Sequence, residues 1–341
     1  MTELKNEGKT GIDPMRLIRV FAVLTLLATY CLIVLGGTVR VTNSGMGCKD
    51  WPLCSSQVGP LSTFHPLMEQ SHRYLASLVT VLIIVLAVAT WRAGRLAHHV
   101  FIPALASVSV IVVQIVLGAI TVITNNAPVT VALHLLVATF FLGIVTVTAV
   151  APFVSPERSW SLTNGPGRLA WSAVVALYLV FISGSIVVNG GAQSACTSWP
   201  ACFSSPAAAG PVTLQLVHRS MVLIGSVLVI AFVVGLVRRK VTDAVERNLA
   251  YAALVLLALQ IVAGAITALD GGRAGIADVH LAVGSALWCC VVAVFALSAR
   301  SRPPAPESGP QHSPLESRHV QPSSSIESFP PQSRSSSNKD S

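Results

Sequence analysis

The stretch Gln114-Ile-Val-Leu-Gly118-Ala-Ile-Thr121 decides the fold, because the chain contains it twice. It returns as Gln260-Ile-Val-Ala-Gly264-Ala-Ile-Thr267, displaced by 146 residues. A long-range repeat of this kind indicates an internal duplication in which each half is one structural unit. We therefore expect two similar halves.

The duplication also carries residues that can hold a cofactor. The same displacement relates His72-Arg73 to His218-Arg219 and His134 to His280, and a displacement of 148 residues relates Cys48 and Cys54 to Cys196 and Cys202. A duplication that keeps two histidines and a cysteine pair in each half predicts two similar cofactor sites.

The composition is that of an integral membrane protein. Of the 341 residues, 53% are hydrophobic and 11% are charged, and the mean hydropathy is +0.70, whereas a soluble chain carries about 25% charged residues. The apolar residues come in runs of about 20, the length that crosses a bilayer core, without the alternation of a membrane β-barrel. The predicted spans are 18–39, 72–91, 101–123, 130–150, 170–188, 217–237, 249–268 and 277–298. The predicted fold class is therefore all-α, with eight transmembrane helices.

The basic residues set the orientation of these spans. With the N-terminus inside, the inner segments hold 17 of the 22 lysines and arginines, and the outer segments hold Arg40, Lys49, Arg73, Arg219 and Arg273. This asymmetry predicts a multi-pass protein of the cell membrane with both termini in the cytoplasm. The net charge of +8 is then a topology signal. Nucleic acid is not expected as a partner, because the chain has no soluble domain with a clustered basic face.

Each half has four helices, an even number, so the halves are parallel repeats related by an axis along the membrane normal. The expected domains are a cytoplasmic arm (1–16), a first four-helix bundle (17–150), a cytoplasmic linker (151–169), a second four-helix bundle (170–298) and a cytoplasmic tail (299–341). The tail is rich in serine and proline and cannot bury a core, so it is predicted to be disordered.

The four repeated histidines all fall in the opening turns of even-numbered spans, at one depth near the outer face. A single histidine at such a place usually lies at the membrane interface. Two in each bundle, at corresponding positions, favour a planar iron macrocycle held by one imidazole from each side. Zinc is the weaker alternative, because neither bundle offers a third ligand nearby. The sequence thus predicts bis-histidine heme in each half, with His72 and His134 in the first and His218 and His280 in the second.

Arg73 and Arg219 directly follow their histidines at the outer interface. They neutralise heme propionates in one interpretation, since guanidinium groups pair well with carboxylates. In the other interpretation they extend to the lipid headgroups. The sequence leaves both open.

The first outer loop of each half contains a cysteine pair around a Trp-Pro dipeptide, Cys48 with Cys54 and Cys196 with Cys202. Outside the membrane, thiols so spaced readily oxidise to small disulfide-closed loops. Zinc binding is disfavoured by the spacing and by the lack of partner ligands. Structural clasps and redox-active disulfides both remain open interpretations.

The two halves differ at one acid. Glu69 lies three residues before His72 on the same helical face, whereas Gln215 takes that place before His218. Glutamine preserves the shape but removes the charge and the capacity for proton transfer. We therefore expect Glu69 to be the catalytic residue of the N-terminal half; the alternative is a solvated loop carboxylate. Asp278 precedes His280 by two residues, on a different face, and is given no catalytic role.

In these features the chain resembles the heme A synthase family over about residues 17–298. The resemblance is carried by the eight spans, by Glu69-x-x-His72-Arg73, by His134, His218 and His280 at the starts of their helices, and by Gly36-Gly37-Thr38-Val39-Arg40-Val41-Thr42 with Ser44-Gly45, leading to Cys48 and Trp51-Pro52.

This resemblance implies an oxidoreductase that converts the C8 methyl group of heme O to a formyl group by successive two-electron oxidations with water-derived oxygen, giving heme A for cytochrome oxidase. His72 and His134 would then hold the substrate heme, and Glu69 would stand near the reacting methyl group. His218 and His280 would ligate heme b as the cofactor. The implied partners are heme O, membrane lipid and an unidentified electron acceptor; contact with heme O synthase and a homo-oligomer are both compatible with it.

The alternative function is a di-heme b-type membrane cytochrome that transfers electrons from quinol without modifying heme. Such a protein would usually place its hemes at two depths, whereas these histidines all lie near one face. A transporter is a third candidate, since parallel repeats also build carriers. The spans lack the midplane charges and the paired Gly/Pro breaks that would mark a transport site.

Overall fold

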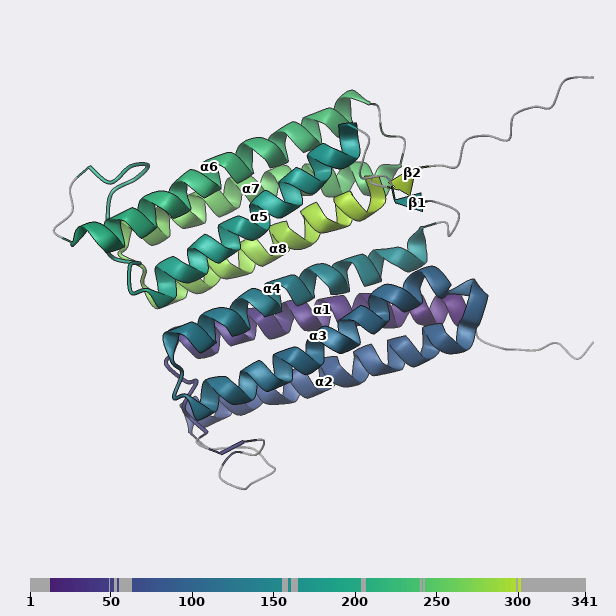
Figure 1. The fold of residues 1–341 in the computed structure, drawn as a ribbon, viewed down its shortest axis with the longest axis horizontal. Coiled ribbons are helices and arrows are strands. Elements are labelled where there is room, and N and C mark those ends of the chain that lie inside the picture. The colour runs from purple at the N-terminus through teal and green to yellow at the C-terminus, as the bar shows by residue number, and fades with distance from the viewer. Residues whose placement is uncertain are drawn as a thin grey trace, which may run out of the picture. The chain divides into compact units, whose positions relative to one another are not determined.

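The structure is a computed structural model that describes residues 13–48, 50–51, 54, 63–154, 159–160, 165–203, 207–239, 241, 243–298 and 300–301. Its helices are α1 (Pro14–Val41), α2 (Phe64–Ala93), α3 (His98–Ile123), α4 (Pro128–Val150), α5 (Gly165–Asn189), α6 (Ala209–Arg238), α7 (Ala244–Leu269) and α8 (Ala274–Ser298) (Figure 1). Gly94–Leu96 and Ala151–Phe153 form short 3-10 turns. Most of the predicted N-terminal arm, and the predicted tail beyond residue 301, lie outside the described residues.

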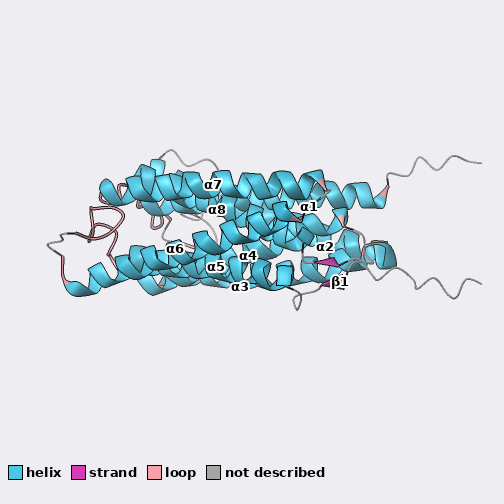
Figure 2. Cartoon of the chain, turned by 90° about the horizontal axis from the view of Figure 1, so that it is seen from above, coloured by secondary structure: helices cyan, strands magenta, loops and turns pink. Residues whose placement is uncertain are grey.

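All eight α-helices are long and apolar enough to cross a membrane, which confirms the predicted fold class. Figure 2 shows them running along one common direction. Helices α2 and α6 begin eight residues before the predicted starts of the second and sixth spans, at Phe64 and Ala209. A hydropathy run ends where polar residues begin, but a helix continues as long as its backbone hydrogen bonds do.

The helices form two groups of four. In the first group α1 contacts α2, α2 contacts α3, α3 contacts α4, and α4 returns to α1. In the second group α5, α6, α7 and α8 contact one another in the same cyclic order. Helices α2 and α4 therefore stand at opposite corners of one bundle, and α6 and α8 at opposite corners of the other (Figure 1).

The duplication is visible in the turns. Residues in the left-handed backbone region end α1, α3, α5 and α7: Asn43, Asn125 and Asn126, Gly191, and Gly271 and Gly272. Asn43 and Gly191 are counterparts in the repeat, as are the pairs 125–126 and 271–272. Glycine and asparagine tolerate this conformation best, and each turn closes with a backbone hydrogen bond to a carbonyl in the last helical turn.

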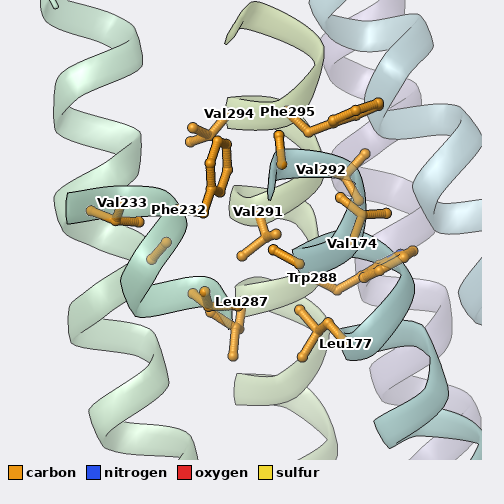
Figure 3. Close-up of a cluster of buried hydrophobic side chains, with 14 of the residues drawn as sticks. Val174, Leu177, Phe232, Val233, Leu287, Trp288, Val291, Val292, Val294 and Phe295 are labelled. Carbon is orange, nitrogen blue, oxygen red and sulfur yellow. The ribbon is translucent and has the colours of Figure 1, made fainter. Parts of the chain in front are cut away.

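The two bundles pack together through α1, α4, α5 and α8, and α8 is the most buried helix of the eight. Figure 3 shows its large side chains, Trp288 among them, packed with residues of α5 and α6. The Trp288 Nε1–H donates to the Thr139 carbonyl of α4 at 3.0 Å. Tyr30 of α1 donates to the Ala282 carbonyl of α8 at 3.2 Å. These bonds fix the register between the halves.

A short antiparallel pair joins the segments on either side of the second bundle. Strand β1 (Ser159–Trp160) pairs with β2 (Arg300–Ser301), with Ser159 opposite Ser301. This pairing ties the segment before α5 to the segment after α8.

Candidate functional site

The four predicted ligand histidines come from the diagonal helices of the two bundles. His72 lies on α2 and His134 on α4, and His218 lies on α6 and His280 on α8. The two imidazoles of each half are close enough to interact electrostatically. Because the two histidines of a half come from diagonally opposite helices, they lie on opposite sides of the bundle interior. A macrocycle held by one ligand on each side requires this placement.

The expectation that all four histidines occupy opening turns is wrong for two of them. His134 and His280 lie in the second turn of their helices, but His72 and His218 lie in the third turn, because α2 and α6 extend further outward. At 1.5 Å per residue, His72 is about 12 Å along α2 from its first residue. The four histidines therefore lie in the second or third turn of their helices, inward from the outer loops.

Each imidazole rests against a glycine of the preceding helix, an arrangement that our sequence interpretation missed. A Cβ atom built at Gly36 would lie 2.9 Å from Cε1 of His72, and one at Gly184 would lie 3.1 Å from Cε1 of His218. The corresponding distances are 3.5 Å from Gly118 to His134 and 3.0 Å from Gly264 to His280. At Gly36 a methyl group would force the ring to shift, and at Gly184 and Gly264 it would press the ring by a few tenths of an ångström, so glycine lets the imidazoles approach closely.

The signal for these glycines was present in the sequence. Gly118 and Gly264 lie within the repeated stretch itself, and Gly36 and Gly184 are related by the displacement of the cysteine pairs. Glycine lowers helix stability relative to alanine. Four glycines kept inside membrane helices at repeat-related positions indicate a close approach by another group.

The donor set fits a bis-histidine heme. Nδ1 of His134 is buried without a hydrogen-bond partner among the described residues. The rings of His72 and His280 have only backbone groups, those of Leu32 and Gln260, as hydrogen-bond partners on that side. Gln260 Nε2 lies 3.4 Å from Nε2 of His280, whereas its counterpart Gln114 donates to the His134 backbone carbonyl at 3.1 Å. No cluster of three or more His, Cys, Asp or Glu side chains with metal-binding geometry occurs in the described part of the chain. Two imidazoles with apolar walls suit iron in a porphyrin better than zinc.

Glu69 is buried, with 5% of its surface exposed, so the interpretation of it as a solvated loop carboxylate is wrong. Its Oε1 forms an ion pair with Arg73 Nη2 at 2.6 Å, and its Oε2 accepts the backbone N–H of Cys48 at 2.8 Å. The carboxylate thus joins α2 to the first disulfide loop. Burial of an acid is tolerated here because both oxygens have donors.

The second half satisfies the same position without charge. Gln215 is also buried, and its Nε2 donates to the carbonyls of Ala192 at 2.9 Å and Gln193 at 3.1 Å. Gln215 donates hydrogen bonds to the loop of the second half, whereas Glu69 accepts one from the loop of the first half. The difference between the halves is therefore one of charge and of hydrogen-bond direction, in the same place.

Arg73 and Arg219 both hold their disulfide loops. Arg73 donates to the carbonyls of Asp50 at 2.7 Å and Cys48 at 3.4 Å. Arg219 donates to the carbonyls of Ser198 at 2.7 Å, Cys196 at 3.0 Å and Pro200 at 3.1 Å. Neither interpretation of the arginines included these bonds. A guanidinium carries five donors, so contact with propionates stays a prediction beside this role.

The predicted disulfides are both formed. Cys48 and Cys54 are joined with a Cα–Cα distance of 4.8 Å, and Cys196 and Cys202 with 5.6 Å. Cys48, Cys54 and Cys196 are almost completely buried, and Cys202 is partly exposed. In the first half the Cys48 N–H donates to Glu69. In the second half Gln215 stands in place of the acid and donates to its loop instead.

Asp278 also occupies an unexpected place, at the junction of the two bundles. Its Oδ2 accepts from Thr38 Oγ1 of α1 at 2.6 Å, and its Oδ1 is buried against Gly37. The expectation of a different face from His280 holds, but that face meets the other half. Thr38 lies in the Gly-Gly-Thr segment that carried the resemblance, next to the glycine that seats His72.

Fold and site together define the class: a multi-pass membrane protein with two parallel four-helix bundles, each with a diagonal histidine pair. The model of the family described as cytochrome oxidase assembly protein matches residues 19–292. The chain is 25% identical to the heme A synthase of Halalkalibacterium halodurans, over 84% of this chain and 99% of that protein. It is 25% identical to the heme A synthase of Lysinibacillus sphaericus, over 84% and 96%, and 27% identical to that of an Exiguobacterium species, over 74% and 83%.

The chain therefore belongs to the cytochrome oxidase assembly protein family, together with the heme A synthases. The predicted family is confirmed. Membership makes the chain a membrane-bound oxidoreductase with a role in heme A biosynthesis.

Proposed function

We propose that this protein is a heme A synthase that oxidises the C8 methyl group of heme O to a formyl group. The observation that carries the proposal is a difference in charge between the two repeat-related sites. Both have a diagonal histidine pair backed by glycines, but among the described residues only the N-terminal site has a buried carboxylate, Glu69, on the face of its histidine. One reactive site and one redox-relay site are what a stepwise oxidation of a bound macrocycle needs.

The C-terminal pair, His218 and His280, is the proposed holder of heme b, and His72 with His134 the proposed holder of the substrate. Heme b, held there by His218 and His280, would supply a one-electron redox centre. Converting a methyl group and water to a formyl group releases electrons and protons in equal number, so the substrate half must also dispose of protons. Glu69 is the buried acid on the helix face of His72.

Glu69 is proposed to stabilise positive charge at the reacting carbon or to take up the released proton. It lies three residues before His72, one helical turn outward on the same face. Arg73 and the Cys48 amide hold its oxygens from the loop side. The carboxylate is thereby kept at a fixed place between the histidine and the outer loop.

The protein is proposed to lie in the cell membrane with both termini in the cytoplasm, which the distribution of lysine and arginine supports. Heme O is its proposed substrate, and heme O synthase is a proposed partner. The electron acceptor is a separate component outside this chain.

The test is to express the full chain with a supply of heme O and to extract the pigments for chromatography and mass analysis. Conversion of heme O to heme A supports the proposal. Recovery of unchanged heme O together with tightly bound heme b and quinol-dependent reduction would favour the di-heme cytochrome instead.

A further inference from the structure

His218 and His72 are equivalent ligand positions, yet their Nδ1 atoms have different surroundings. Ser183 Oγ of α5 lies 2.9 Å from Nδ1 of His218. The residue in the place of Ser183 in the first half is Leu35, since the displacement of 148 that relates Gly36 to Gly184 also relates these two. Leucine offers no hydroxyl, and Nδ1 of His72 has no side-chain partner among the described residues.

The Ser183 hydroxyl has a second contact that fixes the direction of the first. Its Oγ lies 2.9 Å from the Val180 carbonyl, which can only accept a hydrogen bond. A hydroxyl has a single proton, and the carbonyl takes it. Ser183 must then accept from the imidazole, so Nδ1 of His218 carries a hydrogen and Nε2 keeps its lone pair free for iron.

The first half lacks this bridge. The Leu32 carbonyl is the counterpart of Val180, and it is a direct backbone hydrogen-bond partner of the His72 ring, without an intervening hydroxyl. The seating of the two rings is otherwise the same: the Cβ distances from Gly36 and Gly184 to Nδ1 are 3.5 Å in both halves, and those to Nε2 are 3.8 Å in both. The hydrogen-bond chain is therefore the difference between two rings in the same pose.

We propose that Ser183 is a positioning residue that holds His218 in the Nδ1–H form and so strengthens the binding of the C-terminal heme. The inference rests on the proposed assignment of heme b to His218 and His280. A hydrogen bond to the outer nitrogen of a ligating histidine raises its basicity toward the metal, and loss of such a partner typically lowers metal affinity about 10- to 100-fold. The chain from Nδ1–H through Oγ–H to a carbonyl strengthens each bond in it.

The biological sense of this difference follows from the proposed roles. A cofactor has to stay bound through many turnovers, whereas a substrate heme has to leave as product. Ser183 at the cofactor site and Leu35 at the substrate site match these two requirements.

The experiment compares Ser183→Ala with wild type in the purified full chain carrying heme b. Two quantities are measured: the rate of heme transfer to apomyoglobin and the reduction potential of the heme. We expect transfer to be about 10- to 100-fold faster in Ser183→Ala. We also expect a higher potential, because a weaker donor stabilises ferric iron less.

Ser185→Ala is the matched control, since Ser185 is a buried serine of the same helix with Asn189 as its partner. It should leave both quantities unchanged. If Ser183→Ala does not accumulate, Ser183→Thr and Ser183→Val form a pair of equal volume that differs in the hydroxyl. Ser183→Thr should then match wild type in transfer rate and reduction potential. Ser183→Val should show the faster transfer and the higher potential expected of Ser183→Ala.

Equal transfer rates and equal potentials with and without the hydroxyl overturn the inference. That result is distinct from failure of the proposed function, in which no heme b signal depends on His218 at all. A merely structural role of Ser183 would lower the melting temperature without moving the reduction potential, and this outcome also counts against the inference.

Discussion

The carboxylate of Glu69 accepts the backbone N–H of Cys48 at 2.8 Å, so the buried acid beside His72 is bonded directly to a disulfide-closed loop. Arg73 completes the arrangement by binding both Glu69 and the Cys48 carbonyl. The second half repeats the loop and the arginine but has Gln215 in place of the acid. The loop around Cys48 therefore has a role that its counterpart lacks.

Replacing Glu69 with glutamine should abolish product formation while preserving the fold. Gln215 shows that this bundle geometry accommodates a buried glutamine in the same place. The loss of charge and of proton transfer should lower turnover of heme O at least about 100-fold. Pigment analysis after expression of Glu69→Gln measures it, with the heme b spectrum as the control for folding. Full activity in this variant would remove Glu69 from the mechanism.

The two disulfides should be separable by mutation. Cys48→Ser and Cys196→Ser should each lower stability, by about 2 kcal/mol for loops of this size. Turnover should fall in Cys48→Ser, because its loop positions the amide that holds Glu69, and should remain near wild type in Cys196→Ser. Thermal melting in detergent and pigment analysis give the two readouts. Equal losses of turnover in both variants would contradict this division.

The glycines behind the histidines should be sensitive to a single methyl group. A Cβ at Gly264 would lie 3.0 Å from Cε1 of His280, and relieving such overpacking costs about 1 to 3 kcal/mol. Gly264→Ala should therefore reduce the heme b content of the purified protein. Gly235→Ala is the control, because its Cβ would meet its nearest neighbour, Leu169, at 3.8 Å, an ordinary contact. Undiminished heme in Gly264→Ala would show that the ring is not seated as described.

The junction between the bundles should depend on Trp288. Trp288→Phe removes the hydrogen bond to the Thr139 carbonyl, and such a bond between membrane helices contributes about 1 kcal/mol. The melting temperature should fall by a few degrees, more than in Trp171→Phe, whose ring is half exposed. An identical melting temperature for both variants would argue against this junction as a stabilising contact.

The sequence predicted the fold well because its strongest signals were long apolar runs and an internal repeat. These two features depend on the bilayer thickness and on duplication, and neither requires knowledge of packing. The positions of His72 and His218 were predicted less well. Hydropathy could not detect that α2 and α6 continue outward through Glu69 and Gln215. Both residues are polar, yet their side chains are buried against the disulfide loops.

The partners of the site residues could not be predicted from spacing. The bond between Glu69 and Cys48 joins residues on different elements, as does the bond between Ser183 and His218. Only the folded arrangement of α5 beside α6 turns an ordinary helical serine into a histidine partner. The glycines were the exception, since the repeat contained them and a comparison of the halves could have singled them out.

The most direct test of the account is the heme spectrum of the purified full chain and of His218→Ala, His280→Ala and His72→Ala. Bis-histidine ligation in the C-terminal bundle predicts a low-spin heme b spectrum that disappears in the first two variants and persists in the third. An unchanged low-spin spectrum in both His218→Ala and His280→Ala would place the cofactor elsewhere and contradict the account.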